Sequence, residues 1–536
     1  MSRLQKFAFS PEASPADQAV LIEALRDPAL YDHPVRDIRV RETHISWVIL
    51  TGTYAYKIKK AVDFGFLDFS TLAKRHFYCL EELRLNRRFA PHLYLDVLVL
   101  TGDRHRPQWG GAGRPLEYAV RMRQFPQHGL LSAIAARHGL TSAHADEIGR
   151  LVAGMHAQVD RATLDSPHGR PEDVHHWVME NFAHIRPSLY DVDDLQALDR
   201  IGAWCVQEFH GRSSFIEERW RNGYVRECHG DLHLGNLAMV DGRITPFDGI
   251  EFNPQLRWID VMSEVAFLFM DLQDRGYAGL AWRFLNGYLR QTGDYAGLEL
   301  LDYYLVYRAL VRAKVAILRL AQPGLDMAEQ QAVRDEYQSY MDLAGQCTGQ
   351  RRQALIITHG LSGSGKSWYA ERLAEQLGAI RIRSDVERKR LYGYSADADT
   401  DSGVKSGIYT SAASVRTYEQ LARLAQHGLD ADYPVIIDAT FLKRQQRDRF
   451  RQLAASAGVP LLILACDAPQ DTLRRRILMR QAADSDPSEA GIAVLEAQLQ
   501  SQESLGEDEQ GDIFMPAPED AESIEVLADR MAGRMK

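Results

Sequence analysis

The sequence predicts two modules of different fold class, an α+β module followed by an α/β module with a parallel sheet. Strand-like runs such as SWVIL and AYKIKKAV fill residues 35–62, and mostly helical patterns follow to about residue 345. Beyond a polar, glycine-bearing segment, apolar runs such as ALIITHG and YPVIIDAT alternate with helical patterns. This alternation is typical of a parallel sheet that helices cover on both faces.

The expected domains are residues 1–345 and 353–536, joined by a linker at 346–352. A chain of 536 residues is too long for one ordinary core. The net charge of −10 excludes a protein that coats nucleic acid with its whole surface. Five scattered cysteines without a CxxC pair argue against a disulfide framework or zinc site and favour a cytoplasmic protein. Neither a signal peptide nor a membrane-spanning stretch is predicted.

The clearest motif is GLSGSGKS at residues 360–367, which matches G-x-x-x-x-G-K-[ST]. Its glycines let backbone N–H groups surround a phosphate, and the helix that follows adds its dipole. Lys366 is expected to reach the β- and γ-phosphates, and Ser367 to bind Mg²⁺. The residues predicted to bind the nucleotide are Gly360, Ser362, Gly363, Ser364, Gly365, Lys366 and Ser367.

Polar residues beyond the next strands are expected to complete this site. Asp385 is placed to take the proton of an attacking hydroxyl, and Arg388, one helical turn later, to hold a phosphate or the acceptor. Asp438 ends the run PVIID and is placed to contact Mg²⁺ through water. Arg476 and Arg480 share one helical face and are candidates for a lid that stabilises the transferring phosphoryl group. The open alternatives are capping roles for the aspartates and a solvated face for the arginines.

In order and spacing, GLSGSGKS, SDVERKR, VIIDATFLKRQQRDRF and LRRRILMR resemble the AAA_33-type P-loop kinases. That group includes polynucleotide kinases, gluconate-kinase-like enzymes and zeta-toxin-like kinases. The resemblance covers about 353–536 and implies that Asp385 activates the acceptor hydroxyl. It does not identify the acceptor.

A second motif, CHGDLHLGN, lies in the N-terminal module and keeps the spacing H-x-D-L-x-x-x-N of a kinase catalytic loop. Asp231 is expected to orient the acceptor hydroxyl and take its proton, and Asn236 to bind Mg²⁺. Asp248 follows the strand-like run GRITPFD, where such kinases keep a metal-binding aspartate. For His229 we expect a structural, hydrogen-bonded role.

The cation of this first site is predicted upstream. Lys57 in AYKIKK is the candidate for the strand lysine that pairs with the α- and β-phosphates. Its ion-pair partner is expected to be Glu82, or its neighbour Glu81, in the helical run CLEELRLNRR. Taken singly each of these residues is a weak signal, and the prediction rests on their order along the chain.

These motifs resemble the aminoglycoside phosphotransferase and choline-kinase-like branch of the protein-kinase-like fold over about 30–345. With the P-loop motifs, the whole chain resembles proteins labelled bifunctional aminoglycoside phosphotransferase/ATP-binding protein. The resemblance implies that Asp260 braces the catalytic loop. The chain departs from the protein-kinase pattern because the first turn reads RETHIS without G-x-G-x-x-G, glycine replaces the arginine of H-R-D, and Gly249 follows Asp248 directly. These departures indicate a looser hold on ATP and favour a small-molecule acceptor.

The sequence thus predicts an ATP-dependent phosphotransferase with two kinase-type modules, each using Mg²⁺ and ATP or another nucleoside triphosphate. The expected partner is a small-molecule hydroxyl acceptor, with a nucleotide or nucleic-acid end as a further option, and no membrane. The alternative is that only the P-loop module is catalytic and that the N-terminal module is a pseudokinase. Basic runs such as RIRSDVERKR leave a polynucleotide 5′-hydroxyl kinase open, although no aromatic-interleaved groove accompanies them.

Overall fold

The structure is a computed structural model in which the chain forms two compact units. The first unit contains residues 1–140, 158–173 and 217–264, and the second contains 141–157, 174–216 and 265–536. This division does not follow chain order, so the boundaries at 345 and 353 stay predictions. Among the helices in the described ranges, none has both the length and the apolar character that a membrane span requires. The structure describes residues 15–65, 67–320, 324–398, 400, 407–483, 490–516 and 521–536.

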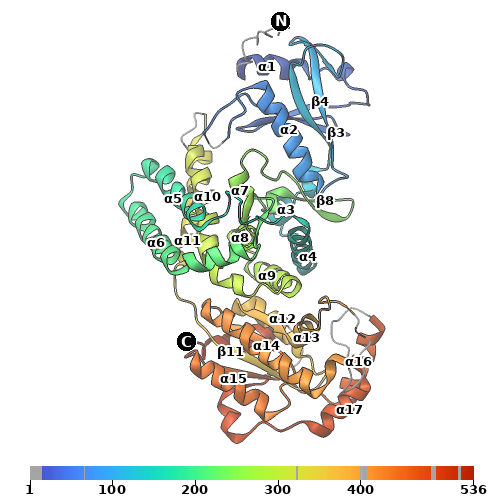
Figure 1. The fold of residues 1–536 in the computed structure, drawn as a ribbon, viewed down its shortest axis with the longest axis vertical. Coiled ribbons are helices and arrows are strands. Elements are labelled where there is room, and N and C mark those ends of the chain that lie inside the picture. Colours follow the sequence, from blue (N-terminus) through green and yellow to red (C-terminus); the bar gives the residue numbers. More distant parts are fainter. Residues whose placement is uncertain are drawn as a thin grey trace. The chain divides into compact units, whose positions relative to one another are not determined.

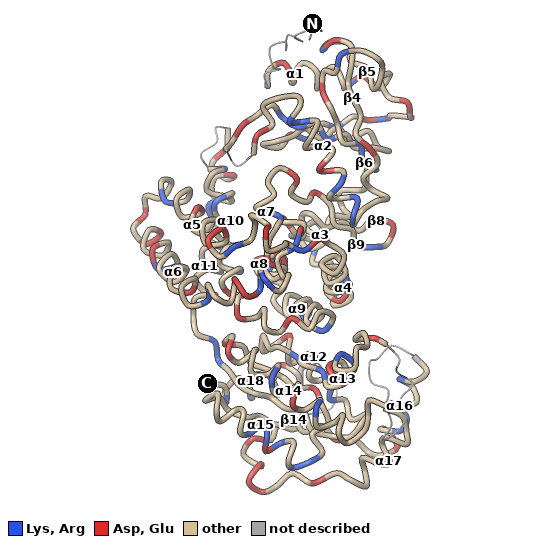
Figure 2. Tube along the Cα trace, viewed as in Figure 1, with Lys and Arg blue, Asp and Glu red and all other residues tan. Residues whose placement is uncertain are grey.

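An antiparallel six-stranded sheet forms the N-terminal half of the first unit (Figure 1). One of its faces packs on α1 (Pro15–Ala24), where Leu21 and Leu25 meet Ile49 and Tyr56 in a shared core. The opposite face receives α2 (Leu72–Arg87), along which basic and acidic positions are interspersed (Figure 2). The strand order is β1-β2-β3-β6-β4-β5, with β1 at Arg39–Glu42, β2 at Ser46–Leu50, β3 at Tyr54–Lys59, β4 at Tyr94–Asp103, β5 at Arg106–Trp109 and β6 at Glu117–Arg123.

Two short strand pairs complete the first unit and carry its motifs. β7 (Val225–Glu227) pairs with β10 (Trp258–Asp260), and β8 (Leu237–Val240) pairs with β9 (Arg243–Pro246). The motif CHGDLHLGN forms the connection from β7 to β8, and Asp248 lies two residues beyond the end of β9. The predicted strand GRITPFD is therefore confirmed as β9. The short helix α7 (Pro254–Arg257) lies between β9 and β10 in the sequence, and the earlier helix α3 (Leu131–Ala136) contacts β8.

The second unit holds most of the helices predicted between residues 129 and 345. The longest of them, α6, is amphipathic, and α10 is largely buried, as its aromatic and aliphatic sequence predicts. These helices are α4 (Ser142–Gln158), α5 (Pro171–Ile185), α6 (Val192–Arg221), α8 (Val261–Asp274), α9 (Ala278–Thr292), α10 (Leu301–Leu320) and α11 (Met327–Cys347).

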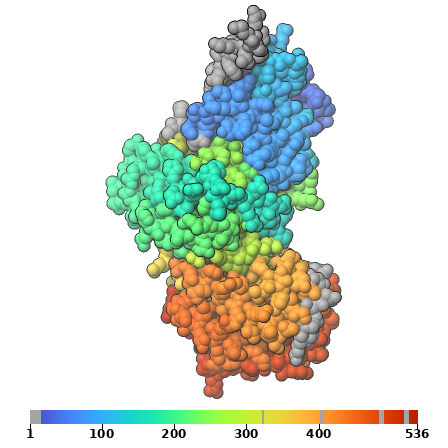
Figure 3. Space-filling view, viewed as in Figure 1, coloured from blue at the N-terminus to red at the C-terminus, as the bar shows by residue number. Residues whose placement is uncertain are grey.

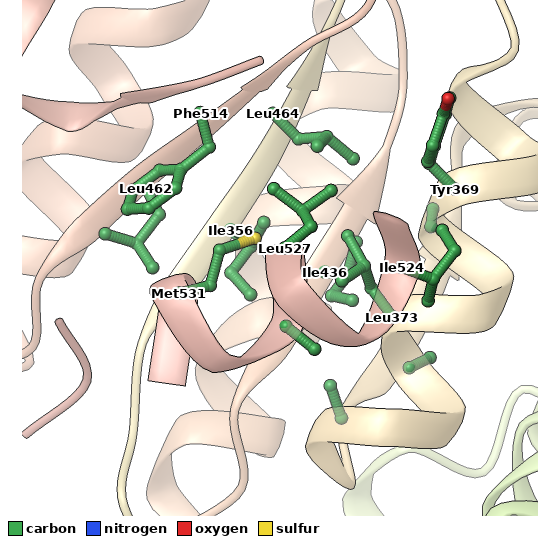
Figure 4. Packing of buried hydrophobic residues seen from close by; sticks show 14 of the residues in the cluster. Ile356, Tyr369, Leu373, Ile436, Leu462, Leu464, Phe514, Ile524, Leu527 and Met531 are labelled. Atoms are coloured by element: carbon green, nitrogen blue, oxygen red, sulfur yellow. The ribbon is translucent and has the colours of Figure 1, made fainter. Parts of the chain in front are cut away.

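The remainder of the second unit contains a parallel sheet, as predicted, and this sheet has five strands. The run SIEVLAD, whose β-rich sequence favours a strand, instead forms part of the last helix. Helices α12 (Lys366–Leu377) and α18 (Ala521–Ala532) cover one face, where Leu373, Leu527 and Met531 pack on Ile356 and Ile436 (Figure 4). On the face shown in Figure 3, the C-terminal part of the chain is drawn in orange and red. The strand order is β12-β13-β11-β14-β15, with β12 at Ile380–Arg383, β13 at Val435–Asp438, β11 at Leu355–His359, β14 at Leu461–Ala465 and β15 at Ile513–Phe514.

The other helices of this sheet carry the predicted acceptor and lid residues or cover its second face. They are α13 (Ser384–Leu391), α14 (Ser411–Asp430), α15 (Arg444–Ser456), α16 (Gln470–Ala483) and α17 (Ile492–Ser501). The acidic, proline-bearing sequence of residues 503–520 predicts a surface loop. The structure instead has β15 and a short 3₁₀ helix in this segment, of which residues 517–520 lie outside the described ones. That expectation was wrong for 507–514 because Glu509 is buried in an ion pair with Arg447.

Candidate active sites

The predicted lysine of the first site forms an ion pair with α2. Lys57 Nζ lies 2.9 Å from Glu82 Oε1, and it also contacts the Asp248 carboxylate. The alternative partner, Glu81, instead contacts Arg84 at 2.9 Å. Burial opposes ionisation of Glu82, but the adjacent lysines outweigh it and keep the pKa of that carboxyl below its ordinary value. Of the two glutamates considered, Glu82 is therefore the one that the fold directs to Lys57.

The backbone around Asp248 is held by side chains from two other elements. Asp248 has a φ of +63°, a backbone conformation that residues other than glycine adopt only at a cost in free energy. Its N–H donates to the Tyr94 hydroxyl at 2.9 Å, and the N–H of Gly249 donates to Asn86 Oδ1 at 2.9 Å. These bonds aim the Asp248 carboxylate, which is 44 % exposed, toward Lys57.

The catalytic-loop motif brings Asp231 and Asn236 together. Asn236 Nδ2 donates to the Asp231 carboxylate at 2.9 Å and to its carbonyl at 2.9 Å. That leaves the amide oxygen of Asn236 as the atom suited to a cation, and oxygen ligands are those that Mg²⁺ prefers. His229 Nε2–H donates to the Phe247 carbonyl at 2.9 Å, which ties the loop to the segment before Asp248 and agrees with the structural role expected for this histidine.

The glycine that replaces the arginine of H-R-D has a local physical explanation. Gly230 has a φ of +86°, and a Cβ atom there would lie 2.8 Å from the Leu256 carbonyl oxygen. Its N–H donates to Glu264 Oε1 at 2.7 Å. Glu264 thus supports the loop directly, and sequence reasoning missed it. Asp260, which was expected to brace the loop, forms a buried ion pair with Arg219 at 2.7 Å.

A cavity of about 680 Å³ lies in the same unit, between the turn that joins β2 to β3 and the segment that follows β6. The Gly52 N–H donates to Gln124 Oε1 at 2.8 Å and links those two segments. Arg36, Arg39 and Arg41 are among the lining residues, as is Asp37, whose carboxylate lies 2.7 Å from Arg39 Nε. The lining thus carries more cations than carboxylates, which suits an anionic ligand.

The P-loop of the second site has the backbone that its glycines predict. Gly360 has a φ of +142°, and a Cβ there would lie 2.2 Å from the Cys466 carbonyl oxygen. At Gly363, with a φ of +85°, a Cβ would lie 2.9 Å from the Leu473 carbonyl oxygen. Lys366 Nζ donates to the Leu361 carbonyl at 2.6 Å within the loop. Burial lowers the pKa of Lys366, although nearby Asp438 opposes that shift.

The two residues predicted to bind Mg²⁺ in the second site lie together. Ser367 Oγ donates to Asp438 Oδ1 at 3.1 Å, and Arg381 Nη2 donates to Asp438 Oδ2 at 2.6 Å. Burial favours the neutral acid, but Arg381 and Arg383 outweigh it and hold the pKa of Asp438 below its ordinary value. Sequence reasoning missed Arg381, whose signal was a basic residue alternating with isoleucines in the run IRIRSD. A hydroxyl beside an ionised carboxylate fits the ligands that Mg²⁺ takes in such sites.

The predicted acceptor residues line a cavity of about 680 Å³ beside the P-loop. Asp385 lies at the start of α13 and is half-buried, while Arg388 on the same helix is buried. Arg388 Nη1 donates to the Ile408 carbonyl at 3.1 Å, and its guanidinium lies 5.0 Å from the centre of the Tyr409 ring. The alternative of a solvated Arg388 is therefore wrong, because this arginine is packed in the cavity wall.

Arg476 and Arg480 both line this cavity, as their shared helical face predicts. Arg476 Nη1 donates to the Gly363 carbonyl at 3.3 Å, and Arg480 Nη2 donates to the Ala490 carbonyl at 2.6 Å. Their neighbour Arg475 is exposed and is not among the described lining residues. Gln498 on α17, which the sequence did not single out, accepts the Ser362 N–H at 2.9 Å. Two helices beyond the P-loop thus contribute to the wall around it.

Comparison with known proteins gives one family match and one group of close relatives. Residues 355–505 match the family described as an AAA domain, AAA_33. The uncharacterized protein Rv2004c of Mycobacterium tuberculosis (strain ATCC 25618 / H37Rv) is 32 % identical over 468 residues. The alignment spans 87 % of this chain and 91 % of that protein.

Solved structures similar to each half of the chain include two kinases. Amicoumacin kinase hAmiN, in complex with AMP-PNP, Ca²⁺ and Ami, is 14 % identical and has a TM-score of 0.38, covering 61 % of this chain and 93 % of its own. A gluconokinase from Sinorhizobium meliloti 1021 is 22 % identical and has a TM-score of 0.24, covering 34 % of this chain and 95 % of its own.

Proposed function

Since this chain belongs to the same family as the mycobacterial protein Rv2004c, and its C-terminal residues to the AAA_33 family, we propose that it is an ATP-dependent phosphotransferase with two kinase-type modules. Each module would transfer the γ-phosphoryl group of ATP, or of another nucleoside triphosphate, to a hydroxyl group. The observation that carries this proposal is that Lys57, Glu82 and Asp248 are in contact within the unit that also holds the Asp231–Asn236 pair.

In the first module, Lys57 would bind the α- and β-phosphates, and Asp248 with Asn236 would hold Mg²⁺. The cation would neutralise charge on the β- and γ-phosphates. Asp231 would orient the acceptor hydroxyl and take its proton as the new bond to phosphorus forms. A cavity in the same unit, lined by Arg36, Arg39 and Arg41, supports binding of an anionic ligand by this module. The shared contacts of Asp231 and Asn236 support a working site over a pseudokinase.

In the second module, backbone N–H groups of the P-loop would surround the phosphates, and Ser367 with Asp438 would hold Mg²⁺. Asp385 would take the proton of the acceptor hydroxyl, and Arg388 would hold the acceptor or a phosphate. Arg476 and Arg480, which share the cavity with Asp385, would stabilise charge on the transferring group. A cavity of about 680 Å³ suits a small-molecule acceptor.

The activities of the two modules can be distinguished in a transfer experiment with γ-labelled ATP and a panel of amino alcohols, sugars, nucleosides and oligonucleotides. We expect Asp231→Ala to abolish one transfer activity and Lys366→Ala to abolish another. Each loss should be at least about a hundredfold, because charge-stabilising groups of this kind contribute that much. Asp241→Ala is the matched control for the first module, since this exposed aspartate lies on the turn between β8 and β9.

If Asp231→Ala keeps every activity of the wild type while Lys366→Ala removes all of them, the N-terminal module is a binding module and the two-engine proposal fails. If neither substitution changes any transfer, the phosphotransferase proposal itself fails.

All five cysteines lie within the described ranges and are buried as free thiols. Their state supports our proposal of a cytoplasmic location.

A further inference from the structure

A second lysine lies beside the predicted phosphate-binding lysine of the first module. Lys59 is two residues beyond Lys57 on β3, so both side chains project from the same face of the sheet. Its ammonium group lies 2.7 Å from Glu82 Oε2 and also contacts the Glu251 carboxylate. The side chain of Lys59 is 1 % exposed, and its ammonium lies 4.9 Å from the centre of the Phe69 ring. A lysine so buried is rare unless it is paired.

The five charges form one alternating chain across three elements. The order of contacts is Asp248, Lys57, Glu82, Lys59 and Glu251. Strand β3 supplies both cations, α2 supplies the carboxylate between them, and the segment 248–251 supplies both outer carboxylates. The chain is buried at one end, where Glu251 is 3 % exposed, and open at the other, where Asp248 is 44 % exposed. The open end is the one that the proposed function assigns to metal and nucleotide.

This arrangement has a consequence for Lys57 when an anionic ligand binds. A lysine that turns from Glu82 toward a phosphate would ordinarily leave a buried carboxylate without a partner, which is strongly unfavourable. Glu82 is fully buried here, yet its second oxygen stays paired with Lys59. Lys57 can therefore engage phosphate while Glu82 remains compensated and α2 remains docked.

We propose that Lys59 and Glu251 are positioning residues of the first module, a proposal that rests on the proposed nucleotide site. They fix Glu82 on α2 and the segment that follows Asp248, so that Lys57 is aligned before nucleotide binds. Neither residue touches the reacting atoms. On this proposal, buried ion pairs hold α2 and Lys57 in place, and the module needs no displacement of a helix to align them.

The test uses the full chain with Lys366→Ala, so that the P-loop module is silent. Two measurements are assigned to the first module. One is the part of ATP hydrolysis that is lost in Asp231→Asn, and the other is the part of Mg²⁺–AMP-PNP binding that is lost in Lys57→Met. Lys59→Met should lower kcat at least about tenfold, and Lys59→Arg should recover part of it. The double variant Lys59→Met, Glu251→Gln removes both buried charges. It should regain thermal stability relative to Lys59→Met but not kcat.

The matched control is the double variant Arg75→Met, Glu117→Gln. This pair is also buried, also involves α2, with Nε–Oε1 at 3.0 Å, and has no contact with Glu82. If Lys59 has only a structural role, kcat should fall and recover together with thermal stability, and it should do so in both double variants. If the Lys59 and Glu251 variant keeps the parental kcat, or regains kcat with stability, the positioning proposal is overturned.

Hydrogen exchange without nucleotide separates this inference from the function on which it rests. Residues 79–87 of α2 and residues 247–252 should exchange faster in the Lys59 and Glu251 variant than in the parent. The Arg75 and Glu117 variant should leave 247–252 unchanged. If the parent binds no nucleotide but shows this pattern, the alignment stands and the proposed function fails. Unchanged exchange in the Lys59 and Glu251 variant overturns the inference itself.

Discussion

The two candidate sites, each proposed to hold phosphate oxygens beside a cation, are built from different parts of the chain. The P-loop site is built largely from backbone within residues 360–367, and two close approaches to Gly360 and Gly363 require glycine. The first site is built from side chains distant in sequence, since Lys57 contacts residues 25 and 191 positions away. A sequence motif is therefore strong evidence for a site that is built from one short backbone segment, such as the P-loop. It is weak evidence for a site that is built from side chains distant in sequence.

The contrast is one of degree, because the P-loop site also contains the distant ion pair of Asp438 with Arg381, and replacing Arg381 measures how much that pair contributes. Arg381→Met leaves the buried Asp438 without its main partner, so we expect a loss of about 3 kcal/mol in the free energy of unfolding. Urea unfolding, followed by tryptophan fluorescence and circular dichroism, measures this loss. The control is Arg383→Met, whose Nε lies 3.6 Å from Asp438 and whose loss should be smaller. Equal losses would show that Arg381 has no special role.

The contrast would weaken from the other side if the catalytic loop also required a particular glycine. Gly230→Ala places a Cβ against the Leu256 carbonyl at a φ of +86°, so we expect a loss of about 2–3 kcal/mol. Gly242→Ala is the control, because its φ of +77° is similar but its Cβ would meet open space. It should lose only about 1 kcal/mol. Thermal denaturation of the two variants compares them, and matching losses would rule out the close contact as the cause.

Arg476, which is proposed to stabilise the transferring phosphoryl group, tests the comparison at the level of catalysis. Arg476→Ala should lower the P-loop transfer activity at least about tenfold, or about 1.4 kcal/mol of transition-state stabilisation, and leave the activity of the first module unchanged. Arg475→Ala alters an exposed neighbour on the same helix and should change neither activity. Labelled-ATP transfer in the two variants checks this, and a similar drop in both would point to helix α16 as a whole.

The smallest expected effect is a pH dependence confined to the P-loop region. Burial, with Arg447 and Lys366 nearby, lowers the pKa of His359 to about 4. As pH falls from about 6.5 toward 4, the unfolded chain therefore gains a proton that the folded chain does not, and stability falls. Discounted for partial exposure, the loss should be about 1 kcal/mol between pH 7 and pH 5. The urea midpoints at pH 7 and pH 5 measure this loss of stability. In His359→Gln the difference between the two midpoints should shrink, and an unchanged difference would show that His359 does not cause it.

The structure brings together several residues that the motifs singled out, such as Lys57 with Glu82 and Asp248, and Ser367 with Asp438. Each motif could be recognised because it spans only a few residues. It could not identify Lys59, Glu251 or Arg381 as parts of the sites. Lysine and arginine are ordinarily exposed, so their burial follows only from packing against carboxylates on other elements. The same reason explains why Glu81 and Glu82 could not be separated before the fold placed one toward Lys57 and the other toward Arg84.

The sequence by itself determined the two fold classes, the P-loop and the order of the kinase-like motifs. Hydrophobic periodicity and glycine placement act over short distances, so they are legible in the chain. Only the tertiary structure decided which charges meet. The alternating chain from Asp248 to Glu251 and the pair of Asp438 with Arg381 depend on burial, which makes unpaired charge costly and so selects one arrangement of distant side chains.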